Sequence, residues 1–277
     1  MPLVAAMLVP GSPLPMLRPD NPPWQPLIKG FAQARERLAA SQPDVLLLYS
    51  TQWIAVLDQL WQTRAHLQGL HVDENWYEFG DLPFDLQVDT ALAEACIEGT
   101  RALGVNAKGV DYDGFPLDTG TIVACRLLDP QSRIPIVLAA NNLYHDWART
   151  KALGAMAAEQ AERAGKRYAV IGIGGLSGTV FRHEIAIEED HFATPEDNAL
   201  NQQLFAALAR GNEPGLDDAC LAYAGAARAD MGLKHLAFVL GALSKRAFGA
   251  ELLGYGPVWG SGAAVIDFTG PGLAQGI

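Results

Sequence analysis

Short runs of apolar residues alternate along this chain with longer segments in which apolar residues recur at helical spacing. Residues 27–38 carry apolar side chains at intervals of four, three and four, which places them on one face of a helix. Further helices are predicted over residues 150–165, 198–210, 216–229 and 233–248. The apolar runs predict strands over residues 3–9, 45–50, 134–140, 168–174 and 261–268, and residues 110–123 are expected to form a loop that leads into another strand.

Most of these strand runs are apolar throughout and lack the alternation of apolar and polar residues that is typical of a sheet with one solvent-exposed face. A sheet built from such strands needs helices on both faces, and helical segments lie between the runs. The pattern therefore predicts an α/β fold with a mixed or mostly parallel central sheet covered by helices on both faces. We find no internal repeat and no long linker rich in Ser, Pro or Gly, so we expect a single domain over residues 1–277.

Residues 66–90 are the least regular stretch and are expected to form an elaborated surface loop. The loop is rich in aromatic residues, namely Trp76, Tyr77, Phe79 and Phe84. Two interpretations stay open. The aromatic side chains either bind a partner protein or pin a long loop to the body of the molecule.

Composition narrows the class of protein. The chain is 49% hydrophobic and 18% charged with a net charge of −11, which is typical of a folded globular protein and argues against nucleic acid or an anionic membrane as partner. No apolar stretch reaches the length of a bilayer span, and the run 3–9 lacks the basic flank of a signal peptide. The three cysteines, Cys96, Cys125 and Cys220, stand far apart. A disulfide framework is therefore unexpected, and we predict a soluble protein of the cytoplasm.

Individual residues give weak signals for chemistry. The glycine-rich run 172–178 follows a predicted strand, but acidic residues soon follow it, which disfavours binding of a nucleotide phosphate. Ser177 lacks the sequence context of a hydrolase nucleophile, and Cys125 is expected to pack in an apolar strand. The segment His183–His191 does not have metal-ligand spacing and indicates a solvated face. The residues alone thus predict only an acidic α/β protein with glycine-rich loops at strand ends.

Four of these loops, taken together, are similar to those of a known family. They are residues 8–13 (LVPGSP), 49–53 (YSTQW), 117–121 (LDTGT) and 174–178 (GGLSG). In their order and neighbours they resemble the class III extradiol ring-cleaving dioxygenases, and the resemblance runs nearly end to end. It implies a non-haem Fe(II) held by two histidines and one glutamate, with a further histidine as acid–base group.

This chain has no histidine at the corresponding positions. The two histidine ligands correspond to Gly11 and Gln52, and the acid–base histidine corresponds to Gly178. A histidine that follows the aspartate of the third loop, here Asp118, is replaced by Thr119. The glutamate ligand opens a late helix, where Lys234 is the expected occupant. Loss of two imidazoles from a three-ligand site removes the site, so the resemblance implies a degenerate pocket and no metal or other cofactor in this chain.

Within the family, this pattern resembles the iron-free subunits of heteromeric dioxygenases that act on 2-aminophenol. Residues 71–80 and 254–257 are consistent with that subunit type. The resemblance implies a non-catalytic structural (α) subunit, a homologous catalytic β subunit that holds the Fe(II), and an α₂β₂ assembly. We expect Trp76, Tyr77 and Phe79 to form part of the interface.

Two alternatives remain open. One is a stand-alone enzyme with changed chemistry that uses Gln52, Asp118, Lys234 and a tyrosine such as Tyr112. The other is a small-molecule binding protein that reuses the old pocket without turnover.

Overall fold

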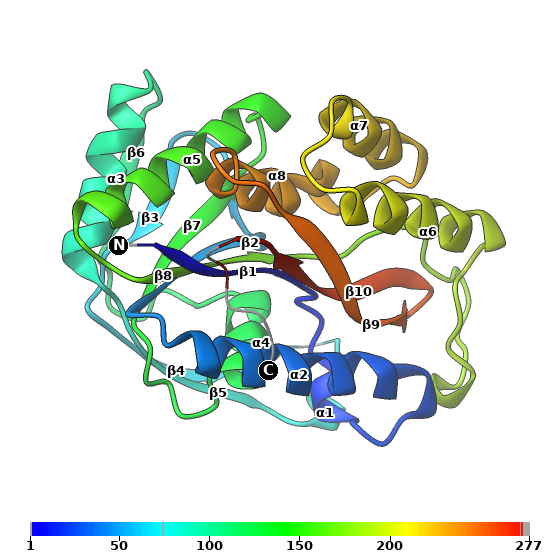
Figure 1. Ribbon diagram of the computed structural model, residues 1–277. Coiled ribbons are helices and arrows are strands. Elements are labelled where there is room, and N and C mark those ends of the chain that lie inside the picture. Colours follow the sequence, from blue (N-terminus) through cyan, green and yellow to red (C-terminus); the bar gives the residue numbers. More distant parts are fainter. Residues whose placement is uncertain (1, 74, 272, 274–277) are drawn as a thin grey trace.

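An eight-stranded mixed sheet runs through the centre of the molecule, in the strand order β6-β3-β7-β2-β8-β1-β10-β9. The computed structural model describes residues 2–73, 75–271 and 273 (Figure 1). The strands of the sheet are β1 (Leu3–Val9), β2 (Val45–Ala55), β3 (Gln59–Gln62), β6 (Ala107–Val110), β7 (Ile136–Asn142), β8 (Tyr168–Ile173), β9 (Gly249–Val258) and β10 (Ser261–Thr269). Strands β7, β2, β8 and β1 are parallel neighbours. Strand β10 pairs antiparallel with β1, and β9 pairs antiparallel with β10.

Helices cover both faces of this sheet (Figure 1). One face carries α2 (Gln25–Ser41) and α4 (Thr119–Leu128), together with the short helix α1 (Leu14–Leu17). The other face carries α3 (Thr90–Ala102), α5 (Trp147–Arg163), α6 (Pro195–Ala209), α7 (Leu216–Ala226) and α8 (Lys234–Ala242). Four 3₁₀ turns lie at Pro22–Trp24, Tyr77–Phe79, Ile187–Glu189 and Asp230–Leu233. The predicted fold class is confirmed.

The two faces of the sheet form separate hydrophobic cores because neighbouring residues of a strand point in opposite directions. In β2, Leu46 and Leu48 pack against α2 and α4, whereas Leu47 and Tyr49 belong to the core under α5 and α8. This double burial explains why the strand runs are apolar throughout. None of the helices in the described part of the chain is long and apolar enough to cross a membrane.

The strand expected to end the segment 110–123 is instead the start of helix α4, so that prediction is wrong. The run Thr121, Ile122 and Val123 is β-branched, which favours a strand locally. Asp118 overrides this preference by capping the helix, since its side chain accepts a hydrogen bond from the Thr121 N–H at 3.0 Å. Helix α4 is buried nearly all round, and Cys125 accordingly lies in a helix rather than in a strand.

The expectation of a surface loop over residues 66–90 is also wrong. This stretch forms a two-stranded antiparallel sheet of β4 (His66–His71) and β5 (Leu82–Gln87), with Leu67, Leu82 and Leu86 buried against the core. The Phe84 ring lies over Gly69 on the opposite strand, where a Cβ would be 2.8 Å from the ring carbon Cζ. Phe84 therefore packs the two strands of the hairpin against each other. Glu74, between the strands, lies outside the described residues, as do residues 1, 272 and 274–277 of the expected domain.

Helices α5 and α8 pack closely because each has a glycine where they meet. A Cβ at Gly154 would overlap the carbonyl oxygen of Phe238, and a Cβ at Gly241 would overlap that of Lys151. In both cases the obstacle is backbone, which cannot rotate away as a side chain would. The separation of the two helices therefore depends on these two glycines.

We predict that Gly154→Ala lowers the free energy of unfolding by roughly 2 kcal/mol, because the added methyl group overpacks this contact. The matched control is Gly225→Ala, at an exposed helical position with nothing within 4 Å of the added Cβ. That variant should gain up to about 1 kcal/mol from helix propensity. Urea denaturation of both variants measures the difference. Equal stability of the two would contradict the close approach of α5 and α8.

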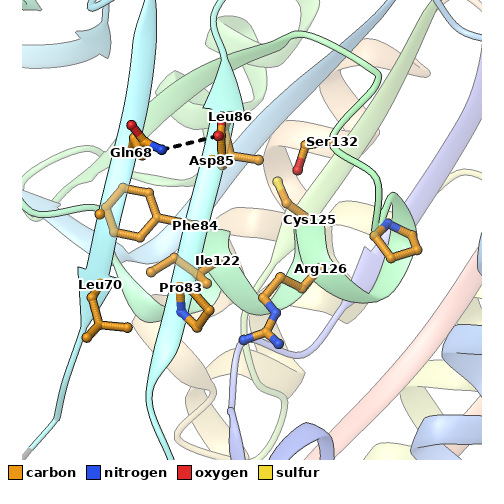
Figure 2. A pocket seen from close by; sticks show the side chains of 12 residues that line it. Gln68, Leu70, Pro83, Phe84, Asp85, Leu86, Ile122, Cys125, Arg126 and Ser132 are labelled. Atoms are coloured by element: carbon orange, nitrogen blue, oxygen red, sulfur yellow. Dashed lines mark hydrogen bonds between the residues drawn. The ribbon is translucent and has the colours of Figure 1, made fainter.

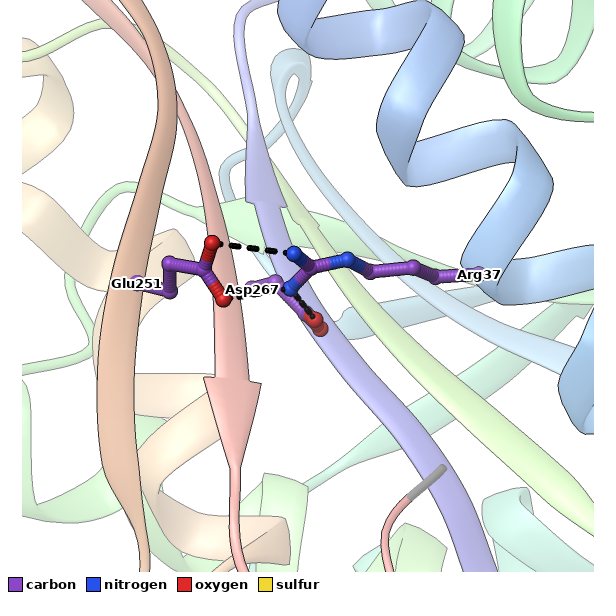
Figure 3. Close-up of polar contacts among 3 residues, drawn as sticks. All are labelled: Arg37, Glu251 and Asp267. Carbon is purple, nitrogen blue, oxygen red and sulfur yellow. Dashed lines mark hydrogen bonds and ion pairs between the residues drawn. The ribbon is translucent and has the colours of Figure 1, made fainter. Parts of the chain in front are cut away.

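A buried ion pair joins helix α2 to the antiparallel end of the sheet (Figure 3). The Arg37 guanidinium donates to Glu251 on β9 at 2.7 and 2.9 Å and to Asp267 on β10 at 2.7 Å. The side chain of Asp267 is only 3% exposed, and burial raises its pKa while the contact with Arg37 opposes that shift. Arg37 also lowers the pKa of the more exposed Glu251. Arg37 thus compensates a carboxylate that would otherwise be buried alone.

Replacing Arg37 with Met should destabilise the fold by about 3 kcal/mol at neutral pH, because it leaves the Asp267 carboxylate buried without a counter-charge. Burial keeps the folded-state pKa of Asp267 above its unfolded value, so protonation favours the folded state. The deficit should therefore shrink as the pH falls towards about 4. Adding Asp267→Asn to this variant should recover part of the loss at neutral pH. Chemical denaturation across pH tests this, and a deficit that grows on acidification would contradict it.

Candidate functional site

The loops that follow β1 and β8 converge with the last residues of β2, where its pairing with β7 shifts register after Ser50. Residues Pro10–Ser12, Gln52 and Gly175–Gly178 meet residues 228–231, which connect α7 to α8, around a cavity of about 400 Å³. The carboxyl edge of a parallel sheet is the usual place for a ligand in α/β proteins. Three of the positions expected from the sequence, Gly11, Gln52 and Gly178, line this one cavity.

The space beside Gly11 is filled by the side chain of Gln52. A Cβ built on Gly11 would lie 2.8 Å from the Gln52 amide nitrogen Nε2 and 2.9 Å from the Gly120 Cα atom. The same amide lies against Gly120, where a Cβ would be 3.2 Å from the Gln52 carbon Cδ. A side chain at position 11 would therefore have to displace Gln52.

Gly178 is covered by the chain between α7 and α8. A Cβ at this position would overlap the carbonyl oxygen of Arg228, and the Gly178 N–H donates to the carbonyl of Ala227 at 3.0 Å. Arg228 has a positive φ of 48°, as do Met231 (44°) and Leu233 (63°) nearby. The left-handed region is unfavourable for residues with a Cβ, so this wall of the cavity is locally strained.

Asp230 holds the cavity loops together. Its Oδ2 atom accepts a hydrogen bond from the Thr51 hydroxyl at 2.6 Å and one from the Gly175 N–H at 2.9 Å. His235 lies behind it, fully buried, and neither ring nitrogen has a hydrogen-bond partner in the described part of the chain. Burial lowers the pKa of His235 to about 4 although Asp230 opposes the shift, so the ring is neutral at pH 7. Sequence reasoning missed both residues because no motif singles them out.

Asp118 and Thr119 lie beside the cavity rather than in its wall. Asp118 accepts hydrogen bonds from the Ser50 hydroxyl at 2.5 Å and from the N–H and hydroxyl of Thr121 at 3.0 and 2.7 Å. Burial raises its pKa, and these hydrogen bonds oppose the shift. The Thr119 hydroxyl is 2.9 Å from the His71 Nε2 atom. These contacts tie β2 and β4 to the first turn of α4.

Lys234 is not brought to the cavity. It is the first residue of α8, and its ammonium group donates to the carbonyl oxygens of Asn142 and Leu143 at 2.8 and 3.0 Å. Burial lowers its pKa. Tyr112 is 70% exposed and lies in the connection between β6 and α4, away from the residues that line the cavity.

A second cavity, of about 630 Å³, lies between the β4–β5 hairpin and α4 (Figure 2). Figure 2 shows Phe84 on β5 and Ile122 and Cys125 on α4 among the residues that line it. Burial raises the pKa of the Cys125 thiol, so the group stays protonated at neutral pH and is a poor nucleophile. None of the expected pocket positions lines this cavity.

The residues of the first cavity do not fit an Fe(II) ion. Gly11 and Gly178 offer no side-chain donor, and the one carboxylate in the wall, Asp230, already accepts two hydrogen bonds through Oδ2. Across residues 2–73, 75–271 and 273, no group of three His, Cys, Asp or Glu side chains could hold a metal ion. His183 and His191 instead pack against the ring of Phe181, with centroid distances of 5.8 and 4.8 Å. The facial arrangement of two histidines and a carboxylate that Fe(II) requires is missing from this cavity.

Comparisons with known proteins agree with this architecture. The chain is 50% identical over 270 residues to the 2-aminophenol 1,6-dioxygenase alpha subunit of Pseudomonas sp., which covers 97% of this chain and 100% of that one. It is 27% identical over 267 residues to the beta subunit named for the same enzyme, covering 91% and 88% of the two chains. The crystal structure of an uncharacterized protein from Escherichia coli K12 shares the fold, with a TM-score of 0.66 at 13% identity over 95% of this chain and 99% of that chain.

A family model described as the catalytic LigB subunit of aromatic ring-opening dioxygenase matches residues 9–266, a span that contains every cavity loop described above. The match confirms the family that the four loops resemble. The chain belongs to the LigB family of aromatic ring-opening dioxygenases.

Proposed function

We propose that this chain is the non-catalytic α subunit of a heteromeric ring-cleaving dioxygenase that acts on 2-aminophenol or a close relative. A homologous β subunit would hold the Fe(II) and carry out the chemistry. The observation that carries the proposal is the 50% identity along the whole chain to a protein named as such an alpha subunit.

The construction of the cavity supports a subunit without its own chemistry. Gln52 occupies the space beside Gly11, and the backbone of Arg228 occupies the space beside Gly178. A histidine at either position would have to displace what is there now. Neighbouring groups therefore occupy the space that a side chain at Gly11 or Gly178 would need, and a single substitution would not create a metal site.

The alternative of a stand-alone enzyme has less support from the geometry. Of the four side chains considered for it, only Gln52 lines the cavity. The carboxylate oxygens of Asp118 accept hydrogen bonds from the hydroxyls of Thr121 and Ser50. The ammonium group of Lys234 donates to backbone carbonyls, and the Tyr112 side chain is exposed. Groups that act together on one substrate need to converge on it.

The expected interface residues lie on the connection between β4 and β5. Tyr77 is 59% exposed, and Leu70 and Val72 at the end of β4 are 58% and 55% exposed. Phe79 is half-buried with the Arg18 guanidinium 5.3 Å from its ring centroid, and Trp76 is half-buried. We infer that this surface, led by Tyr77, contacts the β subunit in an α₂β₂ assembly, because obligate interfaces are rich in exposed aromatic and aliphatic side chains. Three buried, separate thiols suit the reducing cytoplasm, where we place the complex.

We predict that the purified chain binds no stoichiometric iron and consumes no O₂ with 2-aminophenol. The test is metal analysis after anaerobic reconstitution with Fe(II), followed by an oxygen-electrode trace. The double variant Gly11→His with Gln52→His should also stay iron-free, because the rest of the donor set is missing. One iron per chain in the unchanged protein would refute the proposed role.

Co-expression with a homologue that has histidine in all four loops should give a stable heteromer. Size-exclusion chromatography with light scattering measures its mass. Tyr77→Ala should weaken the assembly by about 2 kcal/mol, as loss of an exposed aromatic anchor at an interface often does. Leu103→Ala, at a 47% exposed position following α3, is the matched control and should leave the assembly unchanged. Separate elution of the two unmodified chains at micromolar concentration would contradict the proposal.

A further inference from the structure

The cavity at the carboxyl ends of β1, β2 and β8 has polar groups that the subunit role does not use. At about 400 Å³ it lies within the range of small-molecule sites, roughly 300–1,000 Å³. Its wall combines apolar side chains with a few polar groups, which is the usual composition of such sites. Three groups in the wall, Ser177, Arg228 and Asp230, allow the chemistry of a ligand to be derived.

Ser177 has a hydroxyl proton to donate. Its Oγ atom accepts hydrogen bonds from the Asn201 amide nitrogen and from the Gly262 N–H, both at 3.1 Å. The amide of Asn201 is itself fixed, since its oxygen accepts from the Tyr223 hydroxyl at 2.6 Å. Ser177 is 1% exposed and lines the cavity, and among the described residues no acceptor takes its proton. This buried O–H is therefore available to an acceptor atom of a ligand.

The two charged side chains of the wall have opposite signs. Arg228 is exposed. Its guanidinium donates one hydrogen bond to the Thr179 hydroxyl at 2.7 Å, which uses one of its five N–H groups. Asp230 uses Oδ2 for Thr51 and Gly175, and among the described residues no donor contacts its Oδ1 atom. The wall therefore offers cationic and hydroxyl donors as well as an anionic acceptor.

The rest of the wall is mixed. Pro10, Val180, Met231, Val258 and Ala263 contribute carbon surface to it, and Ser12, Gln52 and Ser261 contribute uncharged polar side chains. A ligand that satisfies the charged and the apolar surface has a short carbon skeleton with an anionic group and an amino group. Neither a bare anion nor a plain aromatic ring would use all three polar groups.

We propose that this cavity binds a small unsaturated amino-carboxylate. Arg228 and the Ser177 hydroxyl donate to its carboxylate, Asp230 accepts from its amino group, and the apolar wall contacts its carbon skeleton. Guanidinium–carboxylate contacts are among the stronger hydrogen bonds in proteins, so Arg228 should dominate the affinity.

The identity of the natural ligand rests on the proposed function. Cleavage of 2-aminophenol between C1 and C6 by O₂ places one oxygen atom on each carbon. The hydroxyl-bearing C1 becomes a carboxyl group, C6 becomes an aldehyde, and the amino group stays on the carbon next to the carboxyl. The ring-opened product is thus an unsaturated 2-amino-carboxylate, and the cavity would allow this subunit to respond to the amount of product formed.

Isothermal titration of the full chain with 2-aminobenzoate tests the site, because this stable probe has adjacent amino and carboxylate groups on an unsaturated body. We expect one site per chain. Benzoate, which lacks the amino group, and aniline, which lacks the carboxylate, should each bind at least about fivefold more weakly. Arg228→Gln should weaken binding of 2-aminobenzoate by about tenfold or more, and Arg228→Lys by less, because it keeps the charge but loses the planar fork.

Arg182→Gln, at an exposed position on the neighbouring segment, is the matched control and should bind like the unchanged chain. Absence of binding at millimolar 2-aminobenzoate, equal binding of benzoate, or unchanged affinity in Arg228→Gln would each overturn the proposal. The titration uses this chain alone. Its failure would therefore leave the assembly experiment untouched, and failure of the assembly would leave the titration result standing.

Discussion

The hydrogen bonds of the Asp230 carboxylate hold together three segments that are far apart in the sequence. They join the end of β2 through Thr51, the loop after β8 through Gly175, and the connection from α7 to α8, to which Asp230 belongs. The Asp118 carboxylate likewise joins two segments, because it accepts hydrogen bonds from Ser50 of β2 and from Thr121 in the first turn of α4. In a family member with iron, the ion would cross-link such loops. In this chain two carboxylates do so with neutral hydrogen-bond donors.

These hydrogen bonds order the loops around a cavity whose residues do not fit Fe(II). A bound ion contributes folding energy as well as chemistry, so loops that hold no ion need other contacts to stay ordered. Here Gln52 fills the gap beside Gly11, and the Arg228 backbone closes over Gly178. The cost remains visible as positive φ angles at Arg228, Met231 and Leu233, which the packing of α8 below them maintains.

The fold could be predicted from the sequence because burial on both faces leaves long apolar runs, and the family because four loops have its residues in its order. Helix α4 could not, since Thr121–Val123 favours a strand locally and only the Asp118 cap and complete burial decide otherwise. The β4–β5 hairpin was missed because its buried residues, such as Leu67 and Leu86, are too few to form a clear period. Loop order grouped Gly11, Gln52 and Gly178, which line one cavity, whereas the positions of Asp230 and His235 depend on a tertiary approach that no local pattern records.

The position of β1 in the sheet has a consequence for how the protein is made. This strand lies between β8 and β10, so that Met7 pairs with Asp267 and Leu8 with Ile266. A ribosome synthesises a chain from the N-terminus, and the first strand therefore emerges long before either neighbour exists. Its apolar side chains and one unpaired edge therefore stay exposed until residues 261–269 of β10 have also been made, and such an edge can pair with another chain in the meantime.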